Sequence, residues 1–359
     1  MQEYTNSNNQ SYLPIILRTS LENWENQLSK ILKTHNPHTF DTFSNQMAEL
    51  IKIDNPGKKA TELEIQNYIE GKTAGKPHSK CGVWVYYPWS NRLVHLIDEF
   101  DFVRLRTNRN RNKITHEEQT QLSSKCIGII GLSVGQSVAL TIATERICGT
   151  LKLADFDTLD LSNLNRIRSG VHNIGLNKAI ITAREIAEID PFLHVEIFTE
   201  GITDTNIHDF IGGKSPLNLL VEVCDSLPVK IKSREAARNA KIPVVMDTND
   251  RGMIDVERFD IEPNRPLFHG LVEESLLQKA PSLPPQEILP VLMKLVSFEN
   301  ASNRLKSSMQ EIGKTITTWP QLASSVVYGG GATCDVARRI LLNDQVNSGR
   351  FYLDIEALI

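Results

Sequence analysis

The feature that most constrains this chain is an alternation of short apolar runs with longer helix-like segments in its C-terminal two-thirds. Helical segments such as Ser137–Ile147 separate the runs, and a further long helix is expected after the glycines at 329–331, which we interpret as part of a loop. This alternation predicts an α/β fold, a Rossmann-like and mostly parallel sheet with helices on both faces. The expected strands are Cys126–Ile130, Leu151–Ala154, His194–Phe198, Leu219–Val223 and Pro243–Met246.

The first hundred residues have a different pattern. Thr19 and Thr61 are each followed three residues later by glutamate, the spacing of a capping box at the start of a helix. The runs Val83–Tyr87 and Leu93–Ile97, joined by a Pro-Trp-Ser-Asn turn, predict a hairpin. We therefore expect a small α+β appendage over residues 1–100, a basic linker or arm over 101–124, and the main domain over 125–359.

Composition excludes several classes of protein. The chain has 39 Lys+Arg and 43 Asp+Glu, a formal charge of −4, so no general attraction to nucleic acid or to an anionic membrane is expected. No apolar run approaches the roughly 20 residues of a membrane span, and the N-terminus lacks the pattern of an export signal. We expect a cytoplasmic protein. The five cysteines form no C-x-x-C pair, which argues against a disulfide framework and a structural zinc.

A glycine-containing turn joins the first strand of the main domain to the helix that follows. Gly131, Ser133 and Gly135 are small enough for backbone N–H groups and the positive end of the helix to approach a phosphate. Asp155, at the end of the next strand, stands where nucleotide-binding sheets place an acid for ribose hydroxyls. The two features predict a nucleotide site without separating ATP from NAD. A tight strand–helix turn with no ligand is the structural alternative.

A longer motif follows, and it is more specific than the glycines. Asp155-Phe-Asp157 precedes Ser-Asn163-Leu-Asn-Arg166, and Lys178 comes twelve residues later in Gly-Leu-Asn-Lys. In this order the residues resemble the ThiF/MoeB/HesA family, whose adenylating domain is shared with ubiquitin-activating enzymes. The resemblance extends over roughly residues 104–359. It implies that residues 125–359 form a ThiF-type adenylating domain.

The resemblance implies a role for each matching residue. Asp155 would hold the ribose, and Asn163, Arg166 and Lys178 would contact the phosphates of ATP. Asp225, after a later strand, would bind Mg²⁺, with Glu222 as a second acid nearby. The cofactors implied are ATP and Mg²⁺. The implied nucleotide-binding set is Gly131, Ser133, Gly135, Asp155, Asp157 and Asn163, and the implied catalytic set is Arg109, Arg166, Lys178 and Asp225.

The basic segment before the main domain also has a counterpart in the family. Relatives supply an arginine from the partner subunit, in a motif like R-x-x-R-Q upstream of the first strand. Arg106-Thr-Asn-Arg109-Asn-Arg111 occupies that place, and we select Arg109, with Arg111 next. An arginine that acts in trans requires at least a homodimer.

The sequence departs from the family pattern in ways that bear on mechanism. The glycine turn has lost two glycines, with Gln136 in the third glycine's place, and Arg166 is followed by Ile167 instead of glutamine. No cysteine lies between Cys224 and Cys334, where ubiquitin-activating members carry a thioester-forming thiol, and both of these cysteines are expected in the core. We infer adenylation without an enzyme thioester.

The substrate side is less specified. Arg251 falls where relatives present the incoming carboxylate and is a tentative substrate residue. The substrate would be the C-terminus of a peptide or small carrier protein, or a small acid. A tryptophan-rich hairpin at 82–89 and the closing Arg-Phe-Tyr-Leu-Asp resemble a bacterial subgroup often fused to a nitroreductase-like flavin domain, so we expect either a stand-alone member or part of a longer protein with a flavin partner.

Two other functions stay open at this level. An NAD(P)-dependent oxidoreductase on the same sheet type explains Gly131, Gly135 and Asp155 but gives Asn163, Arg166, Lys178 and Asp225 no role. A non-catalytic nucleotide-binding scaffold is favoured by the eroded glycine turn. Adenylation is the prediction that uses every residue of the motif.

Overall fold

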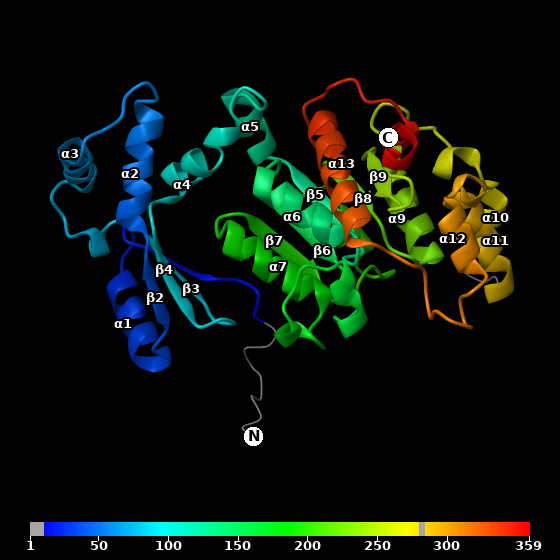
Figure 1. Cartoon of the computed structure of the whole chain (residues 1–359), viewed down its shortest axis with the longest axis horizontal. Helices are drawn as coiled ribbons and strands as arrows, with labels where there is room; N and C mark the ends of the chain where they lie inside the picture. Colours follow the sequence, from blue (N-terminus) through cyan, green and yellow to red (C-terminus); the bar gives the residue numbers. More distant parts are fainter. Residues whose placement is uncertain (1–10, 280–283) are drawn as a thin grey trace. The chain divides into compact units, whose positions relative to one another are not determined.

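The computed structural model describes residues 11–279 and 284–359, which form two units (Figure 1). The first unit is the chain up to His116 together with Ala187–Phe192, and the second is Glu117–Ile186 with Leu193–Ile359. None of the described helices combines the length and apolar character that crossing a membrane would take.

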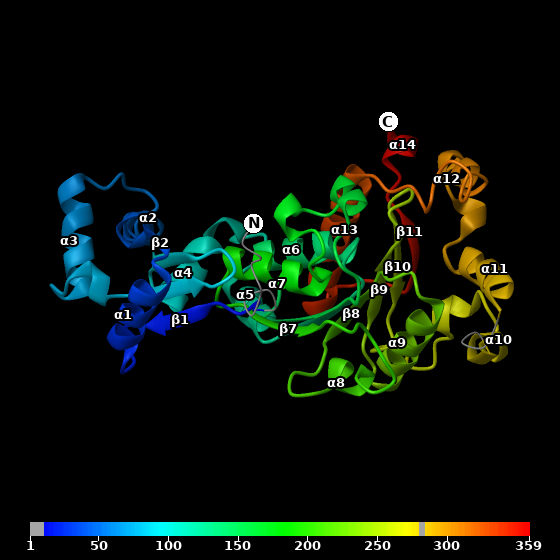
Figure 2. The same cartoon turned by 90° about the horizontal axis from the view of Figure 1, so that it is seen from below.

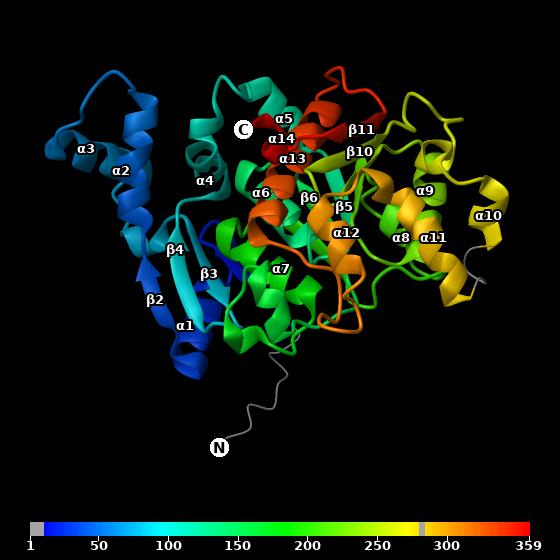
Figure 3. The same ribbon diagram turned by 45° about the vertical axis from the view of Figure 1, so that its right-hand side comes forward.

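The first unit is built on a four-stranded sheet in the order β1-β3-β4-β2. Figure 3 shows three of its strands, β3, β4 and β2. Strands β3 and β4 form the predicted antiparallel hairpin, with Val83 opposite Leu96 and Tyr87 opposite Arg92, and β2 pairs with β4 in parallel. All five residues of β3 are buried, because side chains on both of its faces meet apolar neighbours. The strands are β1 (Ile15–Arg18), β2 (His38–Asp41), β3 (Val83–Tyr87) and β4 (Arg92–Leu96).

The helices of the first unit begin only in part where the sequence predicts. The capping box at Thr61 is confirmed, since its hydroxyl accepts from the Glu64 amide and the Glu64 carboxylate accepts from the Thr61 amide. The prediction for Thr19 is wrong: its hydroxyl donates to the Gly82 carbonyl oxygen at 2.9 Å, and the helix begins at Trp24. The helices are α1 (Trp24–His35), α2 (Phe43–Asp54), α3 (Glu62–Thr73) and α4 (Glu99–Arg106).

The second unit contains the predicted α/β fold. Its seven-stranded sheet has the order β11-β10-β9-β8-β5-β6-β7, in which β9, β8, β5, β6 and β7 are parallel and β10 and β11 are antiparallel additions at one edge. The strands are β5 (Cys126–Ile130), β6 (Thr150–Ala154), β7 (His194–Phe198), β8 (Leu219–Glu222), β9 (Val244–Asp247), β10 (Met253–Glu257) and β11 (Gly349–Tyr352).

Helices cover both faces of this sheet. Figure 2 shows α6 and α13 on one side of it and α8 and α9 on the other. The helices are α5 (His116–Ser123), α6 (Gly135–Glu145), α7 (Lys178–Ile189), α8 (Ile207–Ile211), α9 (Leu227–Asn239), α10 (Glu274–Lys279), α11 (Pro285–Leu295), α12 (Asn303–Met309), α13 (Ala323–Leu341) and α14 (Ile355–Leu358). The last residues of α7 belong to the first unit.

The order of strands creates a switch point at β5. From β5 the chain proceeds to β6 and β7 on one side, and then returns to β8 and β9 on the other. Side chains and backbone at the carboxyl ends of β5 and β8 therefore border a crevice of the kind in which open α/β sheets bind ligands. The glycine turn follows the end of β5, and Asp225 follows the end of β8.

One helix prediction needs correction. The glycines at 329–331 lie inside α13, not in a loop before it. A β-carbon at Gly330 would stand 2.5 Å from Ser137 Oγ, so the glycine lets α13 approach α6 closely. Tertiary packing thus overrides the low helix propensity of three successive glycines.

Candidate nucleotide site

The glycine turn after β5 contacts the end of β6 on one side and the loop after β8 on the other. Gly131 has φ +87°, a value that glycine adopts readily, and its amide donates to the Ala154 carbonyl oxygen at 2.9 Å. A β-carbon at Gly131 would lie 2.9 Å from both the amide nitrogen and Cα of Cys224, so the loop after β8 rests directly on the turn. The turn and the Asp225 loop thereby form one surface.

Asp155 fixes the same turn from the end of β6. Its Oδ2 accepts the Leu132 amide at 2.6 Å and its Oδ1 accepts the Asp157 amide at 2.8 Å. Burial raises the pKa of Asp155, and these two N–H groups and the charge of Lys178 act against that rise. Each carboxylate oxygen keeps a further lone pair, so the group can accept a ribose hydroxyl while it holds the turn.

Arg166 reaches from its loop to the glycine turn. Its Nε donates to Ser133 Oγ at 3.0 Å and its Nη1 donates to Asn165 Oδ1 at 2.8 Å. Burial lowers the pKa of Arg166, and the charge of Asp225 acts in the opposite direction. The structure therefore joins the Arg166 loop to the glycine turn at the switch point, where the loop that carries Asp225 also contacts the turn.

The remaining motif residues hold the loop between β6 and α7. Lys178 Nζ lies 2.8 Å from Asp157 Oδ2, and the Lys178 amide donates to the Asp157 carbonyl oxygen at 2.9 Å. The lysine is buried while Asp157 is half exposed, so the Lys178 ammonium is paired with a carboxylate that solvent or a ligand can reach. Asn163 Oδ1 accepts the Asp160 amide at 3.1 Å, which closes the short helical turn Leu161–Asn165.

The two acids after β8 have different surroundings. Asp225 is exposed, whereas Glu222 is fully buried and forms ion pairs with Lys230, at 3.1 Å, and with Arg234. Burial alone would raise the pKa of Glu222, but the charges of Lys230 and Arg234 lower it to about 2. Glu222 is thus occupied in an internal ion-pair network, and it orients the loop by accepting the Cys224 amide at 2.9 Å. Asp225 is left as the metal candidate.

Three contributors to this region have no signal in the sequence motif. Asn165 Nδ2 donates to the Gln321 carbonyl oxygen at 2.7 Å, which attaches the segment before α13 to the Arg166 loop. Gln136 binds the main chain of Arg168, and the carboxylate of Asp247, at the end of β9, lies against the backbone of Gly329 in α13. Each of these contacts joins segments distant in sequence, so local patterns do not reveal it.

Comparison with known proteins shows to which family the chain belongs. The model of the ThiF family matches residues 107–325, more than half of the chain. This chain belongs to the ThiF family. It is 42% identical over 276 residues, 77% of its length, to an uncharacterized protein of Mycobacterium tuberculosis, and it spans only 38% of that protein. Over 96 residues it is 36% identical to a probable molybdopterin-synthase adenylyltransferase of Porphyra purpurea, a match that covers 26% of this chain and 24% of that protein.

Solved structures support the fold. The crystal structure of selenomethionine PaaA superposes with a TM-score of 0.50 at 20% sequence identity, over 72% of this chain and 78% of that one. At this identity the likeness establishes the ThiF-type architecture of the sheet and its helices and nothing more.

Two cysteines of this ThiF-family chain bear on the question of a thioester: Cys334 is buried, as the sequence predicts, whereas Cys224 is only partly buried. Burial raises the pKa of the Cys224 and Cys334 thiols well above the ordinary value, and the negative charge of Glu222 adds to the effect at Cys224. A thiol nucleophile needs the thiolate form, which these environments disfavour.

The arginines of the basic segment divide into two groups. Arg104 pairs with Asp54 at 2.7 Å and Arg106 with Asp190 at 3.0 Å, both within the first unit. Arg109, in the short turn Asn108–Asn110, and Arg111 are exposed. The ion-paired arginines stabilise the first unit, which leaves Arg109 and Arg111 as candidates for a trans role.

Arg251 is engaged elsewhere in the structure. Its Nε lies 2.6 Å from Asp354 Oδ2, its Nη1 donates to the Asn300 carbonyl oxygen at 2.7 Å, and its guanidinium stacks over Tyr352. A substrate carboxylate would have to replace Asp354 to bind this side chain, so its substrate role stays a prediction.

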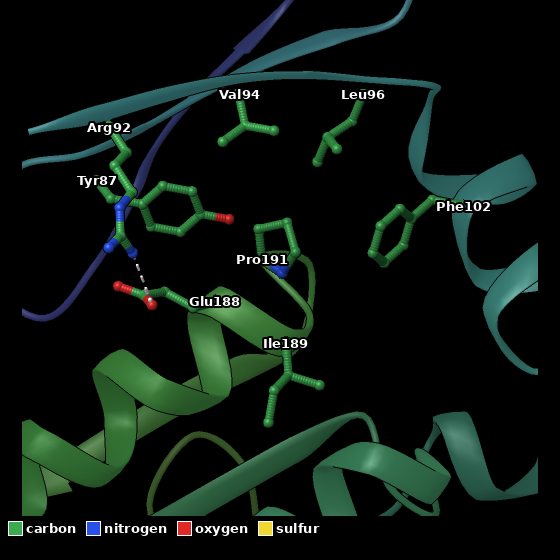
Figure 4. A pocket seen from close by; sticks show the side chains of 8 residues that line it. All are labelled: Tyr87, Arg92, Val94, Leu96, Phe102, Glu188, Ile189 and Pro191. Atoms are coloured by element: carbon green, nitrogen blue, oxygen red, sulfur yellow. Dashed lines mark hydrogen bonds and ion pairs between the residues drawn. The ribbon is translucent and has the colours of Figure 1, made fainter. Parts of the chain in front are cut away.

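The first unit contains a separate cavity of about 210 Å³ (Figure 4). Arg92 Nη1 lies 3.5 Å from Glu188 Oε2 at one side, and the ring of Tyr87 donates its hydroxyl proton to the Ala187 carbonyl oxygen. The other lining residues are Val94, Leu96, Phe102, Ile189 and Pro191. None of the predicted site residues lines it.

Proposed function

We propose that this chain is an ATP- and Mg²⁺-dependent adenylyltransferase that activates a carboxylate as an acyl-adenylate. The single observation that supports this most is the hydrogen bond from Arg166 Nε to Ser133 Oγ of the glycine turn, a turn on which the loop of Asp225 also rests at Cys224. A cation and an exposed carboxylate near a switch point suit a reaction that must stabilise charge on a phosphorus atom and hold a metal. Membership of the ThiF family agrees with this choice.

Each residue of the site has a role in this reaction. A carboxylate oxygen of the substrate attacks the α-phosphorus of ATP, the bond to the bridging oxygen breaks, and pyrophosphate leaves with that electron pair. Arg166 would neutralise the charge that grows on the α-phosphate, since guanidinium groups bind such oxygens in pairs. Lys178 would contact the phosphates as a point charge, and Asp155 would accept a ribose hydroxyl.

The Mg²⁺ site fits the available donors. No cluster of three or more His, Cys, Asp or Glu side chains among residues 11–279 and 284–359 is arranged to hold a metal. Mg²⁺ in nucleotide sites takes one or two carboxylates and completes its shell with phosphate oxygens and water, so the exposed Asp225 suffices. The ion would supply charge neutralisation for the departing pyrophosphate.

The substrate and partners belong to the same proposal. The acid is the C-terminus of a peptide or small carrier protein, or a small acid, and the acyl group leaves the adenylate without passing through an enzyme thioester. The active form is a homodimer in which Arg109 acts on the partner's site. A nitroreductase-like flavin domain as fusion partner, and a cytoplasmic location, stay predictions.

Two measurements test the function. Calorimetry with ATP–Mg²⁺ and, separately, with NAD(P)H should detect binding of ATP alone. Binding of only the dinucleotide would reject adenylation, and binding of neither would favour a non-catalytic scaffold that keeps the fold without a nucleotide. ATP binding with no exchange would favour the nucleotide-binding scaffold. Pyrophosphate–ATP exchange should then be screened with candidate carboxylates, first those of small proteins encoded beside this one. Exchange that depends on an added carboxylate is the expected result.

A further inference from the structure

Gln136 makes a two-bond contact with a single residue of the Arg166 loop. It is the second residue of α6 and is 2% exposed. Its Nε2 donates to the Arg168 carbonyl oxygen at 2.8 Å, and its Oε1 accepts the Arg168 amide at 2.8 Å. The side-chain amide therefore pairs with the main chain of Arg168 as a neighbouring strand would.

A third contact sets the orientation of the Gln136 amide. Its Nε2 also lies 3.3 Å from Glu185 Oε2, on α7. A carboxylate accepts hydrogen bonds and cannot donate when ionised, so only the NH₂ group of Gln136 can face it. The oxygen must then face the Arg168 amide, and every polar atom of the buried amide has a partner.

The clamp acts close to Arg166. Between the clamped Arg168 and Arg166 lies Ile167, which is 4% exposed and packs in an apolar cluster with Leu159 and Ile181. On its other side, Arg166 Nε donates to Ser133 Oγ. Ser133 lies in the glycine turn two residues before α6 and Gln136 is in the first turn of that helix, so adjoining residues of one strand–helix connection contact both the Arg166 side chain and the main chain of Arg168.

We infer that Gln136 is a positioning residue that sets the direction of the Arg166 guanidinium during adenylyl transfer, an inference that rests on the proposed function. The reason is geometric. Arg166 works only if its donors meet the oxygens on which charge develops, and a displacement of about 1 Å can cost ~100-fold in rate. Ser133 holds the Arg166 side chain, and Gln136 holds the main chain of Arg168, two residues further along the same loop.

The test compares Gln136→Met with a matched control, Gln119→Met. Methionine keeps the length of the side chain but loses both bonds. Gln119 also donates from a partly buried amide to a main-chain carbonyl oxygen, that of Arg146 at 2.7 Å, and it contacts neither the glycine turn nor the Arg166 loop through that bond. We expect kcat for exchange to fall roughly 10- to 100-fold in Gln136→Met with the KM for ATP changed less than threefold, and both constants to stay near those of the parent in Gln119→Met.

A second variant separates positioning from folding. Gln136→Glu has nearly the same shape, and its protonated carboxyl can accept from the Arg168 amide and donate to its carbonyl oxygen, whereas the ionised form cannot donate. The new carboxyl would also face Glu185 Oε2, which lies 3.3 Å from the amide it replaces, so its ionisation destabilises the fold as well as the clamp. The kcat of Gln136→Glu relative to the parent should therefore rise as the pH is lowered even within the pH range where urea denaturation shows both proteins fully folded, which excludes a loss of folded protein as the cause.

The outcomes are distinct. If the parent shows exchange and the kcat of Gln136→Met is unchanged, the positioning role is overturned while adenylation stands. The same holds if the kcat of Gln136→Glu divided by that of the parent does not vary with pH. If the parent shows no pyrophosphate exchange with any of the carboxylates screened, the proposed function is overturned and this inference with it.

Discussion

The Asp247 carboxylate lies against the backbone of Gly329, although the two residues are 82 positions apart (247 to 329) in the sequence. A β-carbon at position 329 would overlap Asp247 Oδ2 and stand 2.6 Å from Asp247 Cγ. The end of β9 and the first half of α13 can meet only because residue 329 has no side chain. This contact yields the first two predictions.

Replacement of Gly329 should separate α13 from the sheet. Gly329→Ala is expected to lower the free energy of unfolding by about 1–3 kcal/mol, as overpacking does in a filled core. Gly331→Ala, in the same helix, is the matched control, because a β-carbon at position 331 would meet no atom of the described residues within 4 Å. This change should raise the free energy of unfolding by about 0.5–1 kcal/mol. Urea denaturation measures both. Equal effects of the two changes would contradict the contact.

Asp247 should make stability depend on pH. Burial raises its pKa to about 7, only partly offset by the Asn249 amide that donates to Oδ1 at 2.8 Å, and within the described residues Oδ2 has no hydrogen-bond partner. Between about pH 4 and 7 the folded state keeps a proton that the unfolded chain has released. Stability from this group therefore falls as the pH rises, by at most about 1.4 kcal/mol per pH unit, and levels off above pH 7.

Asp247→Asn removes that dependence. The asparagine still accepts the Asn249 amide and carries no charge, so the variant should gain stability relative to the parent as the pH rises from about 5 to about 8. Chemical denaturation at several pH values across this range gives both slopes. Parallel curves for parent and variant would show that Asp247 is ionised throughout.

Asp225 is expected to be essential for exchange and dispensable for folding. Asp225→Ala should reduce pyrophosphate exchange at least ~100-fold while the unfolding midpoint stays near that of the parent, because the side chain is exposed. Asp335→Ala, which removes an exposed carboxylate from α13, serves as control and should leave exchange unchanged. Exchange that persists in Asp225→Ala would remove this residue from the metal role.

A trans role for Arg109 can be tested by complementation. Arg109→Ala and Asp225→Ala should each be inactive alone, while a mixed dimer restores one complete site of two and about half of the parent activity. The control replaces the Asp225→Ala subunit by one that carries both changes, which can restore no site. If mixed dimers recover no exchange at any ratio, Arg109 does not act across subunits.

Much of the architecture could be predicted because it follows from local patterns. Strands such as Cys126–Ile130 are apolar throughout since helices cover both faces of the sheet, and the Val83–Tyr87 hairpin has a turn that suits it. The motif from Asp155 to Lys178 lies within one βα unit, so its order along the chain already implies proximity. Sequence alone therefore indicated a ThiF-family fold and the main candidates for its site.

What the sequence left undetermined depends on contacts between distant segments. Thr19 has capping-box spacing yet binds Gly82, and the glycines of α13 read as a loop until Asp247 and Ser137 are seen against them. Glu222 was a possible second acid near Asp225 until the structure paired it with Lys230 and Arg234 from α9.

The division has one physical cause. Strand and helix periodicities arise from interactions within a few residues, so the sequence by itself determined the sheet, the hairpin and the order of the nucleotide motif. Whether a polar side chain serves as ligand, clamp or internal ion pair depends on which partner the folded chain brings within hydrogen-bond reach. Only the tertiary structure decided that Gln136 holds Arg168, that Glu222 is enclosed, and that Asp225 stays open to a ligand.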